Sequence, residues 1–229
     1  MGKDRETWER FDKIDYLKNF APGIKLSHLL LEFALLKYKI KGTILDIGGG
    51  PGITPKILRK HKNNSFVYNV EPAKNSLSYK GKNYKAINMP LKKAIEKNLL
   101  PKKVDCIVAC SALHELALSN KKTNSKNKKI MFGELNFVLR TLKKGGFFIV
   151  CEVEYKKEAT DRQIKRHIWI AEHTIGHDHL REELLSIREL KKGLKGLKLI
   201  ETRRKLQTHR YKTHVSKIIW SKLAIFVKN

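Results

Sequence analysis

The stretch of the chain that most constrains its fold is Thr43–Gly52, which reads TILDIGGGPG. Its apolar first half, which carries Asp46, predicts a short buried strand. The glycines predict a tight turn, because glycine tolerates positive φ and lets a ligand lie against bare backbone. A helix over Ile53–Lys60 follows, with Pro55 near its start, where a missing N–H costs nothing. This unit is either a ligand-binding turn or a tight connection that binds nothing.

Helical and strand patterns alternate along the rest of the chain. Amphipathic periodicity predicts helices over residues 5–20, 26–39 and 130–142, with Pro22-Gly23 ending the first of them. Apolar runs predict strands over residues 65–70, 84–87, 104–110, 147–153, 197–206 and 218–227, the last two forming an antiparallel hairpin. Residues 155–193 are expected to be largely helical, with a break at Gly176. The lysine-rich segment 119–129 contains no acid and is expected to be a flexible loop.

Composition restricts the compartment and the partners. The formal net charge is +27, and so basic a surface can hold nucleic acid or an anionic membrane by counterion release. The alternative is that lysines spread over the whole chain have no partner. No run of eighteen apolar residues occurs and the N-terminus is charged, so a soluble, cytoplasmic protein is expected. The three cysteines lie in predicted buried strands, which indicates reduced thiols and no metal site.

An acid closes the second predicted strand. Glu71 lies about twenty residues beyond the glycines, where a carboxylate at the end of the second strand of a doubly wound sheet accepts both ribose hydroxyls of a nucleotide. The fourth predicted strand ends at Cys110 and is followed by Ser111 and then Leu-His-Glu-Leu. Ligands bind outside the carboxyl ends of the strands in such sheets, so His114 is expected to face the ligand.

The spacing Asp-x-Gly-x-Gly-x-Gly, from Asp46 to Gly52, resembles the first motif of the class I (Rossmann-like) S-adenosylmethionine-dependent methyltransferases. It is not the dinucleotide fingerprint, which would need glycine at Ile53. The helix, the sequence LKKGG and the strand at 147–153 also occur together in that family. The Leu-His-Glu-Leu segment resembles members that act on small molecules.

The resemblance implies an α/β fold with a doubly wound, mostly parallel seven-stranded sheet, an antiparallel C-terminal hairpin, N-terminal helices and a helical cap after strand five. It implies one domain over residues 1–229, with an N-terminal lid (1–41, including Tyr16), a cofactor-binding core (42–153), a cap and crossover (154–193) and C-terminal strands (194–229). S-adenosylmethionine would be the methyl donor, with no metal. The implied cofactor contacts are Asp46, Gly48, Gly49, Gly50, Gly52, Glu71, Asn88, Met89, Cys110 and Ser111.

The expected reaction is methyl transfer to an oxygen or nitrogen of a small-molecule acceptor. Removal of the acceptor's proton suits a residue that titrates near neutrality, and His114 is the first candidate. Glu115 could orient it, and His177 or His179 could approach from the cap. One alternative is an RNA methyltransferase that uses the basic surface and the segment 119–129. A second alternative is a non-catalytic module that binds S-adenosylmethionine.

Overall fold

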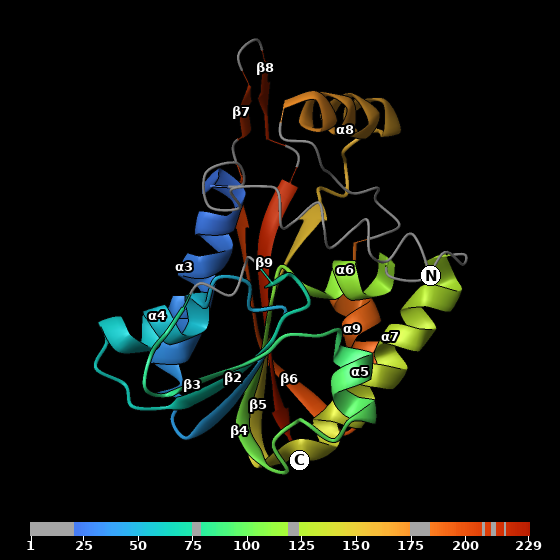
Figure 1. Cartoon of the computed structure of the whole chain (residues 1–229). Helices are drawn as coiled ribbons and strands as arrows, with labels where there is room; N and C mark the ends of the chain where they lie inside the picture. Colours follow the sequence, from blue (N-terminus) through green and yellow to red (C-terminus); the bar gives the residue numbers. More distant parts are fainter. Residues whose placement is uncertain are drawn as a thin grey trace.

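The structure of the protein, a computed structural model, describes residues 21–74, 79–118, 124–174, 184–207, 209–211, 214–217 and 219–229. A seven-stranded sheet in the order β3-β2-β1-β4-β5-β9-β6 forms its centre (Figure 1). The strands are β1 (Thr43–Ile47), β2 (Phe66–Val70), β3 (Tyr84–Ile87), β4 (Val104–Cys110), β5 (Leu142–Tyr155), β6 (Leu197–Leu206) and β9 (Ile219–Lys228). Strands β1 to β5 pair in parallel, and β9 is antiparallel to both β5 and β6. The predicted mostly parallel sheet with antiparallel C-terminal strands is therefore confirmed.

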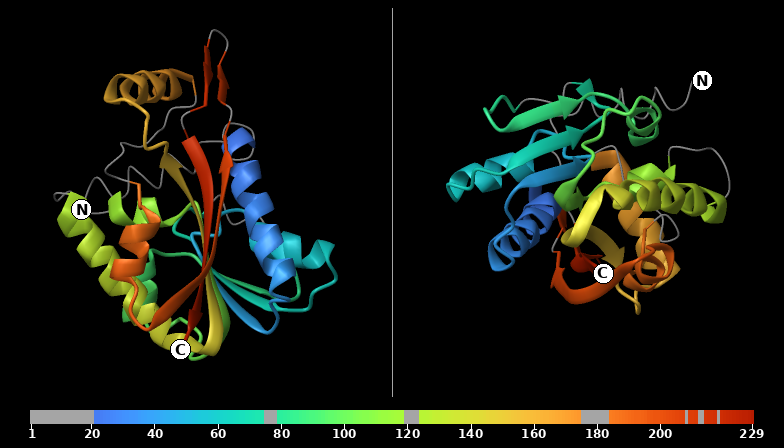
Figure 2. Two further views of the ribbon diagram at one scale, coloured as in Figure 1. Left: turned by 180° about the vertical axis from the view of Figure 1, so that it is seen from behind. Right: turned by 90° about the horizontal axis from the view of Figure 1, so that it is seen from below.

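Helices cover both faces of this sheet (Figures 1 and 2). One face carries α3 (Ala21–Lys37) and α4 (Ile53–Lys60). The other carries α5 (Leu91–Glu96), α6 (Leu113–Leu118), α7 (Asn124–Val138) and α9 (Ile187–Gly193). Beyond the carboxyl ends of the parallel strands stand α8 (Asp161–Thr174) and a small hairpin of β7 (His209–Tyr211) and β8 (His214–Ser216). No helix in the described part of the chain is long and apolar enough to cross a membrane.

The central strands are apolar on both sides because helices lie against both of their faces. Successive side chains of a strand point to opposite faces. Leu45 and Phe148 join the core beneath α5 and α7, whereas Ile44 and Ile149 join the core beneath α3 and α4. Two of the three cysteines, Cys106 and Cys151, are buried as predicted, Cys110 is half-buried, and all three are free thiols.

Several predicted boundaries differ from the observed ones. Pro22 and Gly23 lie inside the first turn of α3 rather than ending a helix, because proline is tolerated where its N–H has no intrahelical partner. Residues 124–129, predicted as loop, form the start of α7. Asn127 and Met131, one helical turn apart, are both buried and fix that start to the core. The predicted helix at 5–20, with Tyr16, and Gly176 lie outside the described residues.

The chain reverses its direction of winding between β1 and β4. Strand β1 has β2 on one side and β4 on the other. From β1 the chain continues through β2 to β3 at one edge of the sheet, and from β4 it continues through β5 toward the other edge. In open α/β sheets a ligand crevice forms at the carboxyl ends of the strands at such a point. The glycine turn that follows β1 and the segment that follows β4 therefore meet at the expected place for a site.

Phe148→Ala is expected to lower the free energy of unfolding by about 3–5 kcal/mol, since a large buried ring is lost from the core. Phe148 is 0% exposed and its ring centroid is 6.3 Å from that of Phe226. Phe137, which is 43% exposed on α7, provides the matched control. Phe137→Ala is expected to cost less than about 1 kcal/mol. Urea denaturation measures both, and similar losses would contradict this assignment of the core.

Candidate functional site

The turn after β1 requires glycine at three positions. Gly48, Gly50 and Gly52 have φ angles of 65°, 48° and 75°, values that other residues rarely adopt. A Cβ atom on Gly48 would lie 2.6 Å from the Cβ of Ala112, so the turn is in contact with the segment that follows β4. At Gly50 an added Cβ would meet nothing within 4 Å. The turn is thus packed on its inner side and open at Gly50.

Asn69, at the end of β2, holds the turn in this conformation. Its side-chain oxygen accepts a hydrogen bond from the Gly49 N–H (3.0 Å), and its amide group donates to the Gly50 carbonyl (3.1 Å). The same amide donates to the Tyr84 hydroxyl oxygen (2.9 Å). Asn69 is fully buried. The sequence analysis did not select it, although a polar residue inside an otherwise apolar strand was the available signal.

Glu71 and Asn88, two of the residues predicted as cofactor contacts, lie beside the turn. The Glu71 carboxylate is buried and accepts hydrogen bonds from the Gly50 N–H (2.9 Å) and the Ala73 N–H (2.8 Å). The Asn88 side chain donates to the carbonyls of Glu71 (3.0 Å) and Pro72 (3.2 Å), which ties the end of β3 to the end of β2. Met89 is next to them and packs against the core. These residues form one continuous wall with the glycine turn.

Asp46 presents a buried carboxylate beneath the same turn. It is 1% exposed, and neither carboxylate oxygen has a hydrogen-bond partner of good geometry among the described residues. Burial raises the pKa of Asp46 to about 7; the nearby Thr54 side chain lowers this pKa and the charge of Glu71 raises it further. An added Cβ on Gly49 would lie 2.3 Å from Asp46 Oδ2. A buried polar group without a partner is costly, so this carboxylate indicates a place for a ligand that donates hydrogen bonds or carries positive charge.

A buried histidine and glutamate pair joins the segment after β4 to β5. His114, 5% exposed, places Nδ1 at 2.6 Å from Oε2 of Glu152, which is 1% exposed on β5. The other carboxylate oxygen of Glu152 accepts the backbone N–H groups of Ala112 (3.0 Å) and Leu113 (2.7 Å). Burial raises the pKa of Glu152, but the charge and hydrogen bond of His114, the Leu113 N–H and the charge of Lys222 outweigh it, and the net pKa is lowered. Glu152 is therefore a carboxylate that orients His114.

Glu152 was missed by the sequence analysis, which considered the adjacent Glu115 for this task. The Glu115 side chain, like all of His177 and His179, lies outside the described residues. Cys110 is the last residue of β4, as predicted, and Ser111 follows it in the connection to α6. Ser111 has a φ of 53° and donates its N–H to the Cys151 carbonyl at 2.7 Å. The hydrogen bond to the Cys151 thiol and burial raise the pKa of the Cys110 thiol, so Cys110 is not a thiolate nucleophile.

Three further charged residues form a network beside Glu152 in the sheet. Lys222 on β9 is directly opposite Glu152 in the strand register and is 0% exposed. Its Nζ donates to Glu154 Oε2 at 3.2 Å, and Arg204 Nε lies 2.5 Å from Glu154 Oε1. Burial lowers the pKa of Lys222, partly offset by the charges of Glu154 and Glu152. Buried charges survive when they are paired in this way. The described residues contain no cluster of three side chains able to hold a metal ion.

Comparison with known proteins identifies structural relatives. No family model and no curated protein matches the sequence. A chain in the complex of the Haloferax volcanii Trm112 methyltransferase activator with a candidate methyltransferase matches with a TM-score of 0.61 and 17% identity, over 99% of this chain and 96% of that one. Magnesium protoporphyrin IX methyltransferase from Synechocystis, with bound S-adenosylmethionine, matches with a TM-score of 0.56 and 11% identity, over 94% and 85% of the two chains. The cyclopropane synthase MmaA2 from Mycobacterium tuberculosis matches with a TM-score of 0.51 and 15% identity, over 79% and 61%. What is shared at such identities is the fold.

Asp46→Asn is expected to make the ligand-free protein more stable above pH 7. The pKa of Asp46 rises from 3.8 to about 7 on folding, so the folded state binds its proton more tightly. The contribution of Asp46 to the free energy of unfolding therefore falls as pH rises from about 4 to about 7, and at 1.36 kcal/mol per pKa unit the loss is roughly 2–4 kcal/mol. Urea denaturation between pH 4 and 8 measures this difference between wild type and Asp46→Asn.

Asp105→Asn is the control, because the contribution of Asp105 to the free energy of unfolding changes with pH in the opposite direction. Partial burial raises the pKa of Asp105, but the Lys143 ammonium and the Thr43 N–H outweigh it, and the net pKa is lowered. Asp105 therefore stabilises the fold above its unfolded pKa, and this stabilisation is lost as pH falls through the folded value. Equal pH dependence in wild type and Asp46→Asn would show that Asp46 is not held in an unfavourable site.

Proposed function

We propose that this chain, which has the Rossmann-like fold of the class I S-adenosylmethionine-dependent methyltransferases, is itself such a methyltransferase. The observation that carries the proposal is the buried carboxylate of Asp46, which has no hydrogen bond of good geometry among the described residues and only the Thr54 hydroxyl nearby, beneath a glycine turn that is open at Gly50. A fold alone does not establish an activity. A carboxylate in need of a cationic or hydrogen-bonding partner, at the end of the strands where ligands bind, is a separate reason.

The residues around the turn fit S-adenosylmethionine chemically. Its ammonium and sulfonium groups are positive, which suits the carboxylate of Asp46. Its ribose hydroxyls are donors suited to the Glu71 carboxylate, and Asn88 and Met89 offer a polar and an apolar contact for the adenine. The positive φ values at Gly48, Gly50 and Gly52 favour glycine, which has no side chain, so a ligand can approach the backbone of the turn. Cys110 and Ser111 complete the proposed wall on the side of His114.

The donor supplies a methyl group on a sulfonium, which is already a good leaving group. The acceptor oxygen or nitrogen forms a bond to the methyl carbon while the carbon–sulfur bond breaks, and the electron pair of that bond stays on sulfur. The protein contributes mainly alignment of the two reacting atoms. His114 takes the proton that the acceptor loses, and Glu152, through Nδ1, fixes the ring orientation and stabilises the imidazolium that results.

We favour a small molecule as the acceptor. His114 is deeply buried, and α8 stands over the same end of the sheet, where an apolar cluster of Tyr155, Ile164, Ile168 and Ile219 attaches it to β5 and β9. A histidine that is buried to this extent suits a small acceptor better than a polymer. The sequence also has no Asn-Pro-Pro-Tyr or Asp-Pro-Pro-Tyr segment after β4, the motif for methylating exocyclic amines of bases. RNA as the acceptor is the alternative that the +27 charge supports.

Gly50→Ala is expected to weaken S-adenosylmethionine binding at least tenfold, because the added methyl group would occupy the open side of the turn. Gly145→Ala is the matched control: Gly145 also has a positive φ (73°), and a Cβ there also meets nothing within 4 Å, but it lies at the opposite end of the sheet. Both changes cost similar backbone strain, about 1 kcal/mol. Isothermal titration calorimetry, with protein freed of copurified ligand, measures the affinities.

Wild type and Gly145→Ala are expected to bind with dissociation constants in the micromolar range. If the two substitutions weakened binding equally, the glycine turn would not be part of the cofactor site. No heat with the wild type would reject the methyltransferase proposal. Binding without turnover of any metabolite or RNA in an acceptor screen would favour the non-catalytic module.

Glu152→Gln is expected to lower kcat at least tenfold with the acceptor that such a screen identifies, while KM changes less than threefold, because the substitution removes the charge that supports a protonated His114. Nitrogen-15 chemical shifts of His114 should show a changed distribution of the proton between Nδ1 and Nε2. Glu154→Gln removes a carboxylate from the same strand that pairs with Lys222 and Arg204 instead. If Glu154→Gln had the same effects on kcat and on the His114 shifts, the role of Glu152 would be a general one in charge balance.

A further inference from the structure

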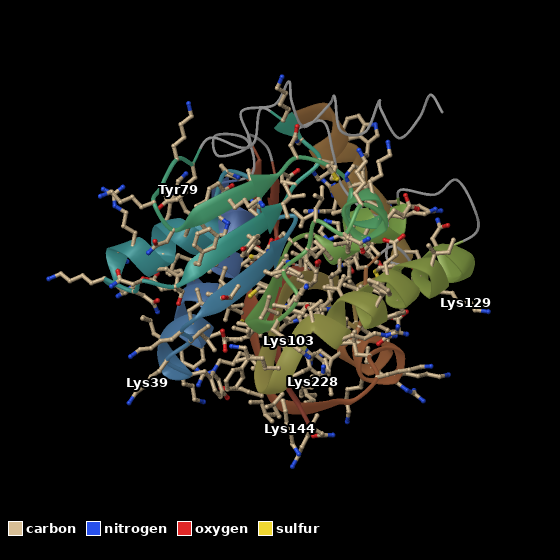
Figure 3. The ribbon with its side chains drawn as sticks, turned by 60° about the horizontal axis from the view of Figure 1, so that its bottom comes forward. Lys39, Tyr79, Lys103, Lys129, Lys144 and Lys228 are labelled. Carbon is tan, nitrogen blue, oxygen red and sulfur yellow. The ribbon has the colours of Figure 1, made fainter. Side chains whose placement is uncertain are left out.

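A row of lysines follows the edge of the sheet opposite the candidate site. At this edge, here called the amino edge, β1, β4, β5 and β6 begin and β9 ends. Each of these five neighbouring strands has at least one lysine there. Figure 3 shows Lys103, Lys144 and Lys228 close together on this side of the molecule, with Lys39 beyond them. The lysines of the row are Lys41, Lys102, Lys103, Lys143, Lys144, Lys195, Lys198 and Lys228, all exposed except Lys228, which is half-buried.

Acids do not balance this charge. In the segments that form the amino edge, residues 39–43, 101–105, 140–146, 195–198 and 227–229, Asp105 is the one acid. Its carboxylate is already engaged by the Lys143 ammonium (2.6 Å) and the Thr43 N–H (2.8 Å). The carboxyl ends of the strands differ, since Asp46, Glu71 and Glu152 lie there. The two edges of the sheet therefore differ in sign as well as in position.

Lys228 shows that cations are held close together at this edge. Its Nζ donates hydrogen bonds to the carbonyls of Leu139 (2.9 Å), Arg140 (3.4 Å) and Leu142 (2.6 Å), which fixes the ammonium at the junction of α7 and β5. Burial, together with the charge of Lys103, lowers the pKa of Lys228. A polyanion that contacts both lysines would relieve this repulsion and release its own counterions.

The shape of the row selects the kind of polyanion. Neighbouring strands are about 4.8 Å apart, so the four gaps between five strand ends span roughly 19 Å. A row of this length can lie along several successive phosphates of one nucleic-acid strand. A membrane presents a broad charged plane, whereas this is a line. At one side of the row Phe137 is 43% exposed, with the guanidinium of Arg140 5.4 Å from its ring centroid, and an exposed ring suits stacking of an unpaired base.

We propose that the amino edge binds the backbone of a single-stranded nucleic acid and tethers the protein to it. The strands between this edge and the candidate site are five to seven residues long in β1 and β4, or roughly 16–23 Å at about 3.3 Å per residue. A nucleotide held on the row is therefore too far from His114 to accept a methyl group. The amino edge is a docking surface separate from the reaction site, and the proposal does not depend on the proposed methyl transfer.

The test uses the full chain and a fluorescent twelve-nucleotide oligouridine, with anisotropy measured from 50 to 300 mM salt. The edge variant combines Lys103→Gln, Lys144→Gln and Lys198→Gln. The control variant combines Lys56→Gln, Lys93→Gln and Lys165→Gln, three exposed lysines on α4, α5 and α8. Both variants lose the same charge, and thermal unfolding checks that both remain folded.

The edge variant is expected to bind at least tenfold more weakly at 100 mM salt. The slope of log affinity against log salt is expected to flatten by about two, since each single-strand phosphate contact contributes about 0.7. The control variant should lose less than threefold. Gly50→Ala should bind like the wild type, so a failed cofactor site and a failed tether give different results.

Three outcomes would overturn the proposal. Equal losses in the edge and control variants would mean that the charge acts diffusely. Tighter binding of a twelve-base-pair duplex than of the single strand would exclude a single-strand tether. Binding to vesicles of phosphatidylcholine with 30% phosphatidylserine, without binding to oligouridine or to oligothymidine of the same length, would assign the amino edge to an anionic membrane.

Discussion

The hydrogen bonds between the glycine turn and the end of β2 hold the candidate site together. Asn69 and Glu71 accept the N–H groups of Gly49 and Gly50, so the backbone of the turn is fixed by side chains from a neighbouring strand. The close approach of Gly48 to Ala112 passes this constraint to the segment that carries His114. The positions of the turn, of Glu71 and of the pair of His114 and Glu152 therefore depend on one another, and a change in any of the three would disturb the others.

The carboxylates in and around the site differ in how well hydrogen bonds and cations stabilise their charge. Glu71, Glu152 and Glu154 have their carboxylates satisfied by backbone N–H groups or by cations. Asp46 does not, although it is as deeply buried. Proteins retain such a group when another gain outweighs its cost, and groups of this kind cluster at functional sites. The same reasoning separates Lys222, which is buried and paired, from the lysines of the amino edge, which are exposed and crowded.

Local pattern was sufficient for most of the fold. The predicted bounds of the strands at 84–87, 104–110 and 197–206 agree with β3, β4 and β6, because uninterrupted apolar or alternating runs between turn residues leave few other options. The glycine turn and Glu71 were placed correctly because strand, acid and spacing coincide. Asn69 and Glu152 were missed because their role depends on partners 20 and 38 residues away in the sequence, which no local pattern reveals. The start of α7 was missed because its lysines indicated solvent, whereas the contacts of Asn127 and Met131 determine its structure.

The position of β9 has a consequence for how the chain is made. β9 follows β6 in the sequence but lies between β6 and β5 in the sheet. During synthesis β6 therefore emerges from the ribosome before the strand that it pairs with. The edge of β5 stays unpaired until β9 has been translated. Open edges attract other chains. The nascent protein is thus most exposed to aggregation, and most dependent on chaperones, in the interval before its last strand inserts.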